Sequence, residues 1–150
     1  MAWVADRHHG NCTMTPSIHY RTGYKYQLAS EYITRTDIRP VSAVETPYIE
    51  LTPEGVLTIR GSYAWDGPSG PTFDSKSALR GSLEHDAKTQ LMRLGLIPRN
   101  EKQKMDDEFY DTCVEDGMWK WRASAWRTML RYFGDASTRP SAEPIVRTAP

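Results

Sequence analysis

Hydrophobic and polar residues alternate in the first half of the chain, whereas apolar positions recur at helical spacing in the second half. Between His19 and Ile38, aromatic and branched residues alternate loosely with polar ones, which predicts one or two strands. In the segment 48–63, YIELTPEGVLTIRGSY, two apolar runs lie on either side of TPEG, an order typical of a β-hairpin. The Gly- and Pro-rich segment 66–74, DGPSGPTFD, then ends the strands.

Three helices are predicted after this loop. The first runs from about residue 75 to Leu94, and Gly95 follows it at the position that favours a left-handed backbone. The second spans roughly 101–116 and the third spans 118–133, with a glycine after each of them. The sequence therefore predicts an α+β fold, in which a small antiparallel β-sheet in the N-terminal half packs against a three-helix layer in the C-terminal half.

Length and composition predict a single domain. A chain of 150 residues is long enough to bury one core. Residues 1–18 lack a period and are interpreted as an irregular N-terminal arm, 19–134 as the α+β domain, and 135–150 as a tail rich in Pro, Ser and Ala. Because 19 basic residues balance 19 acidic ones, the overall charge gives no reason to expect specific nucleic-acid binding.

The chain carries no sequence signal for a membrane or for secretion. It has no run of about 18 apolar residues and no basic N-terminal region before an apolar one, so we expect neither a transmembrane segment nor a simple secretory signal. Cys12 and Cys113 are too few for a disulfide framework and are interpreted as reduced thiols of a cytoplasmic product. His8 and His9 beside Cys12 match no closed four-ligand zinc pattern, and a solvated arm is the expected structure there.

The sequence RGSLEHDAKTQL places a histidine and an aspartate side by side in the first predicted helix. At about 100° per residue, Leu79, Leu83 and Leu94 fall on one stripe, which we expect to face the core. Asp86 lies at the edge of that stripe, and His85 lies on a narrower strip that is suited to line a cleft.

The second predicted helix carries an acid inside its apolar stripe. Met105, Phe109 and Cys113 form that stripe, and Asp106 lies within it. The same geometry turns Asp107, Glu108 and Asp111 outward.

Two interpretations of these acids are open. Asp86 and Asp106 are both aimed at the interior, where an unpaired charge is costly, so both need partners. In a structural interpretation, Asp86 caps the glycine-rich loop and Asp106 holds His85. In a functional one, His85 is a general base and Asp86 is a cation ligand.

The order of these motifs resembles a phage and prophage family called domain of unknown function 1353. That family combines a D-G-x-S/P loop after a strand, H-D-x-x-Y on one helix and A-D-x-x-F on a second helix. The corresponding residues here are Asp66-Gly67-Pro68-Ser69, His85-Asp86, and Asp106 with Phe109. The similarity covers 63–118, and Thr89 and Met105 replace the tyrosine and the small residue of the family. The resemblance implies a phage origin and leaves the activity open.

The same residues are similar, more weakly, to the site of calcium-dependent secreted and parvoviral phospholipases A2. In those enzymes a glycine-rich loop and the Asp after the His bind calcium, the His activates water, and a second Asp orients the imidazole. The similarity implies a calcium site at Gly67, Gly70 and Asp86. It assigns water activation to His85 and orientation of the imidazole to Asp106.

The third predicted helix, in MWKWRASAWRTMLRYFG, combines aromatic and basic residues. Such a helix can lie on a membrane surface or stack on nucleic acid, but two apolar faces favour packing between the core and a partner. One face contains Trp121, Ala125, Met129 and Tyr132. The other, which we expect to contact a protein partner, contains Trp119, Trp126, Leu130 and Phe133.

These features lead us to expect a bacteriophage or prophage protein, a minor structural or assembly component of the virion that carries a His-Asp pocket. It would be made in the host cytoplasm and then enter the virion, with other phage structural proteins as partners. The alternative is a calcium-dependent hydrolase similar to phospholipase A2 that acts on host lipid or envelope during entry or lysis. A third hypothesis is an inhibitor of a host protein.

Overall fold

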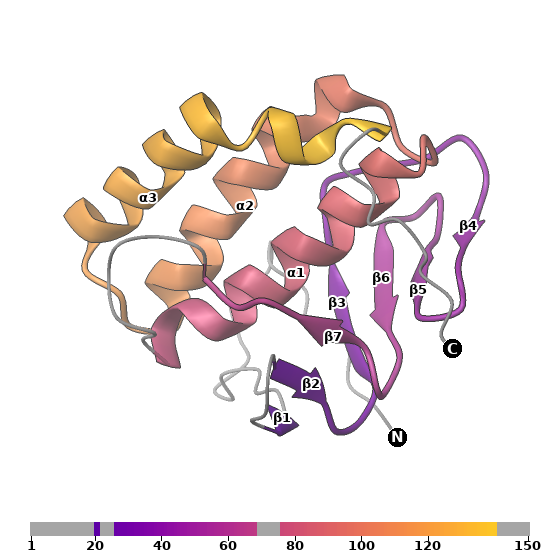
Figure 1. Ribbon diagram of the computed structural model, residues 1–150, viewed down its shortest axis with the longest axis horizontal. Helices are drawn as coiled ribbons and strands as arrows, with labels where there is room; N and C mark the ends of the chain where they lie inside the picture. Colours follow the sequence, from indigo (N-terminus) through magenta and orange to yellow (C-terminus); the bar gives the residue numbers. More distant parts are fainter. Residues whose placement is uncertain (1–19, 22–25, 69–75, 141–150) are drawn as a thin grey trace, which may run out of the picture.

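The computed structural model describes residues 20–21, 26–68 and 76–140. Antiparallel strands occupy the N-terminal half of the chain and helices the C-terminal half, which confirms the predicted α+β fold (Figure 1). Within the described residues the strands form two sheets, whereas the sequence predicted one. The helices lie together on one side of the strands (Figure 1).

The larger sheet contains the predicted hairpin. Its strands, in spatial order and all antiparallel, are β3 (Tyr32–Arg35), β6 (Val56–Ile59), β5 (Ile49–Leu51) and β4 (Val44–Glu45). Leu51 pairs with Leu57 across the turn, where Gly55 has a φ of +76°, a left-handed conformation that suits glycine. Ile49, Leu51, Leu57 and Ile59 are all buried, so alternate positions of the hairpin face the core.

The smaller sheet brings the first strands next to the start of the glycine-rich loop. It contains β1 (Tyr20–Arg21), β2 (Tyr26–Leu28) and β7 (Ala64–Trp65), in that order. The sequence did not predict β4 and β7 as separate strands, because two residues are too few to show a period. β7 nevertheless fixes where the loop begins, because Asp66 follows it directly.

The described helices follow the predicted order. They are α1 (Lys76–Arg93), α2 (Lys102–Glu115) and α3 (Lys120–Phe133), with the short 3-10 turns η1 (Arg99–Glu101) and η2 (Ala136–Thr138). Gly95 and Gly117 have φ values of +70° and +90° just after α1 and α2. The amide of Met118 donates to the carbonyl of Cys113 at 2.9 Å, so α2 closes with the hydrogen bond that a left-handed glycine allows.

α1 is the central helix of the fold, and its predicted orientation was right for Leu79 and Leu83, which are buried, but incomplete. We expected one buried stripe, but most of its side chains are buried, charged ones included. Leu83 and Leu91 pack in the core beneath the sheets, while Ala78 packs with residues of α2 and α3. Leu94, which we placed on the buried stripe, is exposed. A helix that packs against the strands and against other helices has only a narrow accessible side, which here lines the cavity, so its hydrophobic pattern does not report which way it faces (Figure 1).

The buried charges of α1 are paired with β3 and α2. Arg80 donates to both carboxylate oxygens of Asp116, with Nη2 at 2.8 Å from Oδ1. The hydroxyl of Tyr32 donates to Glu84 at 2.7 Å. These contacts join the sheet, α1 and α2 through polar groups that are shielded from water.

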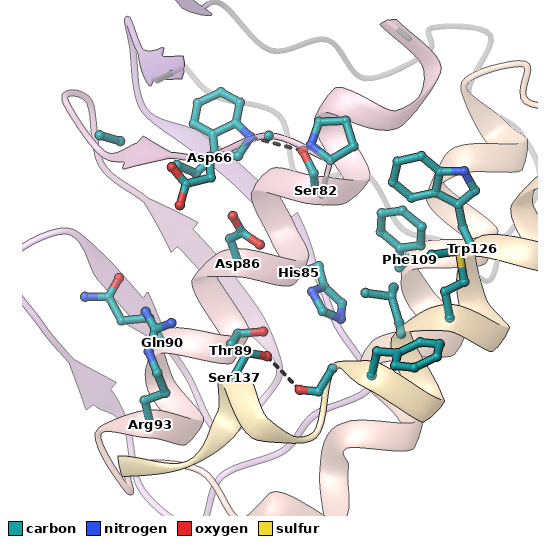
Figure 2. A pocket seen from close by; sticks show the side chains of 18 of the residues that line it. Asp66, Ser82, His85, Asp86, Thr89, Gln90, Arg93, Phe109, Trp126 and Ser137 are labelled. Atoms are coloured by element: carbon teal, nitrogen blue, oxygen red, sulfur yellow. Dashed lines mark hydrogen bonds between the residues drawn. The ribbon is translucent and has the colours of Figure 1, made fainter. Parts of the chain in front are cut away.

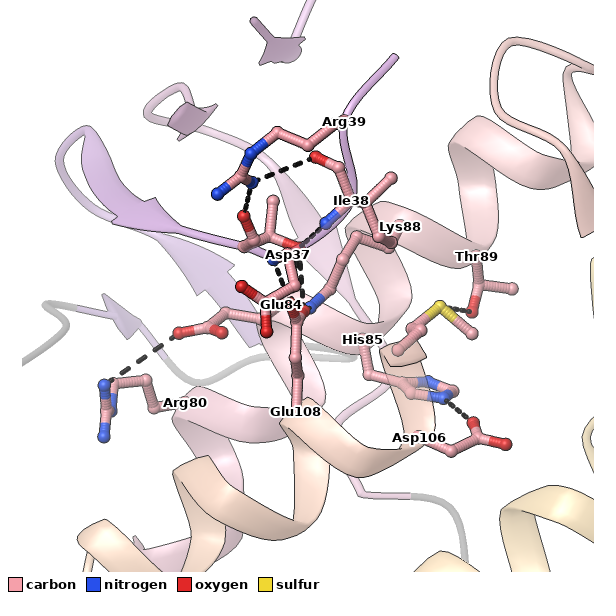
Figure 3. Close-up of polar contacts among 12 residues, drawn as sticks. Asp37, Ile38, Arg39, Arg80, Glu84, His85, Lys88, Thr89, Asp106 and Glu108 are labelled. Atoms are coloured by element: carbon pink, nitrogen blue, oxygen red, sulfur yellow. Dashed lines mark hydrogen bonds and ion pairs between the residues drawn. The ribbon is translucent and has the colours of Figure 1, made fainter. Parts of the chain in front are cut away.

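Glu108 belongs to the same buried network, and its predicted outward position was wrong. Its side chain accepts hydrogen bonds from the Lys88 ammonium and from the hydroxyl of Thr36 at 2.8 Å (Figure 3). The backbone amide of Asp37 also donates to it. Lys88 lies on α1, so a residue distant in sequence allows Glu108 to be buried. The hydrophobic pattern of α2 does not predict this burial.

The chain turns back onto α1 after α3. Arg99 bonds Asp135 at 2.6 Å and the hydroxyl of Thr138 at 3.2 Å, and Thr138 is fully buried. The 3-10 turn η2 contacts α1. Residues 135–138, which the sequence assigned to the tail, therefore pack against the domain.

Candidate functional site

A cavity of about 540 Å³ lies between α1, α3 and the chain that follows β7 (Figure 2). α1 contributes Ser82, His85, Asp86, Thr89, Gln90 and Arg93 to its lining. Residues 63–68 line a second side, and α3 contributes Trp126, Met129, Leu130 and Phe133. The predicted His-Asp pair and the beginning of the predicted loop therefore meet in one cavity.

His85 and Asp106 form a dyad across the contact between α1 and α2. His85 Nε2 lies 2.9 Å from Asp106 Oδ1 (Figure 3). The other carboxylate oxygen of Asp106 accepts a hydrogen bond from Lys102 Nζ at 2.6 Å. His85 lines the cavity and Asp106 does not, so the imidazole stands between the carboxylate and the cavity.

The charges of the dyad favour a neutral imidazole. Burial lowers the pKa of His85 below its usual 6.5, and the hydrogen bond to Asp106 offsets this effect only in part. Burial alone would raise the pKa of Asp106, but the hydrogen bonds from His85 and Lys102 outweigh it and hold that pKa below 3.8. At neutral pH an ionised Asp106 therefore accepts a hydrogen bond from a neutral His85.

This arrangement fixes the tautomer of His85. An ionised carboxylate can only accept, so the proton of the neutral ring must be on Nε2. Nδ1 then carries the lone pair, and it has no hydrogen-bond partner among the residues that the structure describes. The geometry thus leaves the basic nitrogen for a molecule in the cavity.

Aromatic side chains hold the imidazole in place. The ring of Phe109 meets the ring of His85 edge-on, with centroids 5.7 Å apart and an angle of 74°. Trp126 stacks on Phe109 at 5.9 Å. Both aromatic rings also line the cavity, so His85 has apolar neighbours there beside polar ones such as Asp86 and Gln90 (Figure 2).

Asp86 lies apart from the dyad. Asp86 and Asp106 were both predicted to be aimed at the interior, but only Asp106 bonds the ring, and Asp86 lines the cavity together with Asp66 (Figure 2). Carboxylates suit a hard cation such as calcium. No group of three or more potential metal-ligating side chains occurs within residues 20–21, 26–68 and 76–140, so further calcium ligands there would come from backbone carbonyls or water.

Gly67 has a conformational reason to be glycine. Its φ is +75°, and a Cβ at this position would lie 2.5 Å from the ring of Tyr26. Trp65 Nε1 donates to Ser82 Oγ at 3.0 Å and ties this part of the chain to α1. The start of the loop is thereby held against the cavity, as the functional interpretation requires. Gly70 lies outside the described residues.

Lys102 is the site residue that sequence reasoning missed. The hydroxyl of Thr89 is directed at Met105 Sδ at 3.7 Å, so this residue does not take over the role of the absent tyrosine. Lys102 holds Asp106 instead, one helical turn earlier on α2. The spacing of four residues between a lysine and an acid was visible in the sequence, but it is common on solvated helix surfaces.

The two faces of α3 have the opposite orientation to the one we expected. On the expected partner face, Trp126 is buried and Leu130 is half-buried against the second core cluster. Trp119 and Phe133, at the two ends of that face, are exposed. The face with Trp121 and Tyr132, which we expected to face the core, is open to solvent.

No helix in the described part of the chain has the length and apolar character needed to cross a membrane. No family model, curated protein or solved structure matches the chain.

Proposed function

We propose that this chain is a hydrolase of carboxylic esters in which His85 is the general base. The observation that carries the proposal is the position of His85, which is bonded through Nε2 to a buried carboxylate and whose ring lines a cavity. A histidine held in this way has the tautomer and the neutral charge that proton abstraction from water requires.

The reaction would proceed in two proton transfers. Nδ1 of His85 takes a proton from a water molecule while the water oxygen bonds to the ester carbonyl carbon. The imidazolium then gives its proton to the departing alkoxide as the C–O bond breaks, and the products are an acid and an alcohol. Asp106 stabilises the imidazolium between these steps, and Lys102 holds Asp106 in position.

Phospholipid esters are the proposed substrates because one part of the cavity is lined by aromatic and aliphatic side chains and another part by polar ones. Phe109, Trp126, Leu130 and Phe133 offer an apolar wall, and Asp66 and Asp86 lie on the lining with His85. Calcium is the proposed cofactor, with Asp86 and the Gly67 carbonyl among its ligands. When bound, it would polarise the ester carbonyl.

Hydrolysis of phospholipid vesicles tests the proposal. We expect wild-type protein to release fatty acid and His85→Ala to lose that activity. The matched control is Gln103→Ala, an exposed residue of α2, which should keep the wild-type rate. Equal rates for wild type and His85→Ala would overturn the proposal. A rate unchanged by a calcium chelator would remove calcium and leave the role of His85 standing.

We also propose that the protein is made in the cytoplasm of an infected host and joins a phage particle as a minor structural or assembly component. The support is that the residues resembling the phage family, Gly67, His85, Asp86 and Phe109, line one cavity, with Asp106 directly behind it. Motifs that converge in space are more specific than motifs that merely follow in order. Mass spectrometry of purified particles tests this setting, and absence of the protein from them would contradict it.

A further inference from the structure

Five large side chains of α3 and the residue before it are exposed to solvent, three on its open side and two at the ends of its other side, and we call the five together the aromatic face. They are Trp119, Trp121, Met129, Tyr132 and Phe133. Trp119, Tyr132 and Phe133 are each more than 70% exposed, with fractions of 72%, 78% and 79%. Contiguous exposed apolar groups of this size are rare on monomeric proteins and mark a contact surface.

The aromatic face follows the helix axis. Trp121, Met129 and Tyr132 recur at spacings of eight and three residues, which places them on one side of α3. The rings of Trp119 and Trp121 lie 6.2 Å apart at the start of the helix, and Tyr132 with Phe133 closes its other end. α3 forms an outer edge of the molecule, on the side away from the larger sheet (Figure 1). The aromatic face therefore extends about 20 Å along the helix axis and is long enough to contact a flat surface.

The charge on α3 is entirely positive. The helix carries Lys120, Arg122, Arg127 and Arg131 and no acidic residue. Arg127 and Arg131 both contact the single carboxylate of Asp107, at 3.2 and 2.7 Å, so this pairing leaves an excess of positive charge. A helix with aromatic and cationic side chains and no acids complements the surface of an anionic bilayer.

The aromatic face is continuous with the cavity. Met129 and Phe133 are exposed and also line the cavity that contains His85. A lipid molecule beneath the helix would therefore meet an apolar path from the bilayer to the dyad. This continuity favours lipid over nucleic acid, because single-stranded nucleic acid binds along positively charged grooves and this cavity contains two carboxylates, Asp66 and Asp86.

We infer that the aromatic face of α3 docks the protein on an anionic membrane surface, with the cavity at the edge of the contact. Trp and Tyr side chains lie at the headgroup level of bilayers, and the cations of α3 add attraction to anionic lipids. Membrane docking does not depend on the proposed hydrolysis. The delivery of lipid to His85 rests on that proposed function.

Vesicle sedimentation with ether-linked phospholipids tests docking, because these lipids cannot be hydrolysed at an ester. Vesicles of phosphatidylcholine alone are compared with vesicles that also contain phosphatidylglycerol, both in the presence of a calcium chelator. We expect binding to the anionic vesicles and a loss of roughly tenfold or more in affinity for the double variant Trp121→Ser/Tyr132→Ser. Val41→Ser/Tyr48→Ser removes exposed apolar side chains elsewhere and should bind as the wild type does.

His85→Ala separates the two proposals, since it should lose hydrolysis and keep vesicle binding. Thermal unfolding confirms that each variant is folded. Equal vesicle binding by wild type and by Trp121→Ser/Tyr132→Ser would overturn the inference, and so would absence of binding to anionic vesicles. The inference is also wrong if no form of the protein binds vesicles and the double variant loses another interaction instead. Loss of binding to a single-stranded oligonucleotide would assign the aromatic face to nucleic acid, and loss of self-association would assign it to a second copy of the chain.

Discussion

Lys102 Nζ donates to the carbonyl oxygen of Leu130 at 2.8 Å, so the ammonium group that holds Asp106 also attaches α3 beside the cavity. One side chain thereby connects the dyad on α1 and α2 to the helix that carries the aromatic face. Its charge also acts on His85, because Lys102 contributes to the lowered pKa of that residue. Lys102 is therefore a positioning residue, and its effect on the pKa of His85 can be measured separately from its contribution to packing.

Replacement of Lys102 by methionine should shift the pH dependence of hydrolysis. Loss of the cation raises the pKa of His85, so the acidic limb of the pH–rate profile moves to higher pH. The profiles of wild type and Lys102→Met are compared over the range in which both proteins remain folded. Lys104→Met, an exposed lysine on the same helix, is the control and should leave the profile in place. A profile that keeps its position and loses only height would indicate a purely structural role for Lys102.

Asp106→Asn should reduce turnover by roughly 10³–10⁴-fold, because the amide can stabilise the wrong tautomer of His85 and cannot stabilise an imidazolium. We expect the loss in kcat with a smaller change in KM, since Asp106 does not line the cavity. Steady-state kinetics on a micellar ester measure both constants. A loss confined to KM would contradict the role of Asp106 in the proton transfers.

The titration of His85 should be displaced to acidic pH. Its pKa in the folded protein is lowered below the usual 6.5. The ring therefore remains a neutral base until the pH falls below this lowered pKa. The unfolded chain binds a proton near pH 6.5 and the folded one resists it, so the free energy of unfolding should also decrease as the pH falls below 6.5. NMR of the imidazole protons, assigned with His85→Gln, follows the titration. A midpoint above 6.5 would contradict the cause we assign, which is burial.

Lys88→Met should destabilise the fold strongly, because it leaves the buried Glu108 without its cation. Lys88 is 1% exposed and Glu108 is 6% exposed, and breaking a buried pair costs about 3–5 kcal/mol of unfolding free energy. The double variant Lys88→Met/Glu108→Leu should recover much of this loss, since no charge is then left unpaired. Urea unfolding measures all three proteins. A single-variant cost below about 1 kcal/mol would show that the pair behaves as an exposed one.

The order of the motifs along the chain was enough to identify His85 and Asp106 as a dyad. It was not enough to identify the residues that surround the dyad. His85 was selected because it lies on a strip suited to line a cleft, and Asp106 because it lies inside the apolar stripe of the next helix, and they do meet. Asp86 was placed on a different strip of the helix from His85, and it lines the cavity without being part of the dyad. Lys102 was overlooked because its spacing from Asp106 is equally typical of a solvated ion pair.

The sequence by itself determined the local features of this protein: the hairpin at its TPEG turn, the order of the helices, and the ends of α1 and α2 at glycines in the left-handed conformation. These features depend on backbone preferences and on contacts a few residues apart. The tertiary structure decided that α1 packs against both the strands and the other helices, and that Glu108 is buried against Lys88. It also decided that Trp126 is buried while Trp121 is exposed. Each of these depends on which surface is covered by a distant part of the chain, and the hydrophobic pattern of one helix contains no information about its neighbours.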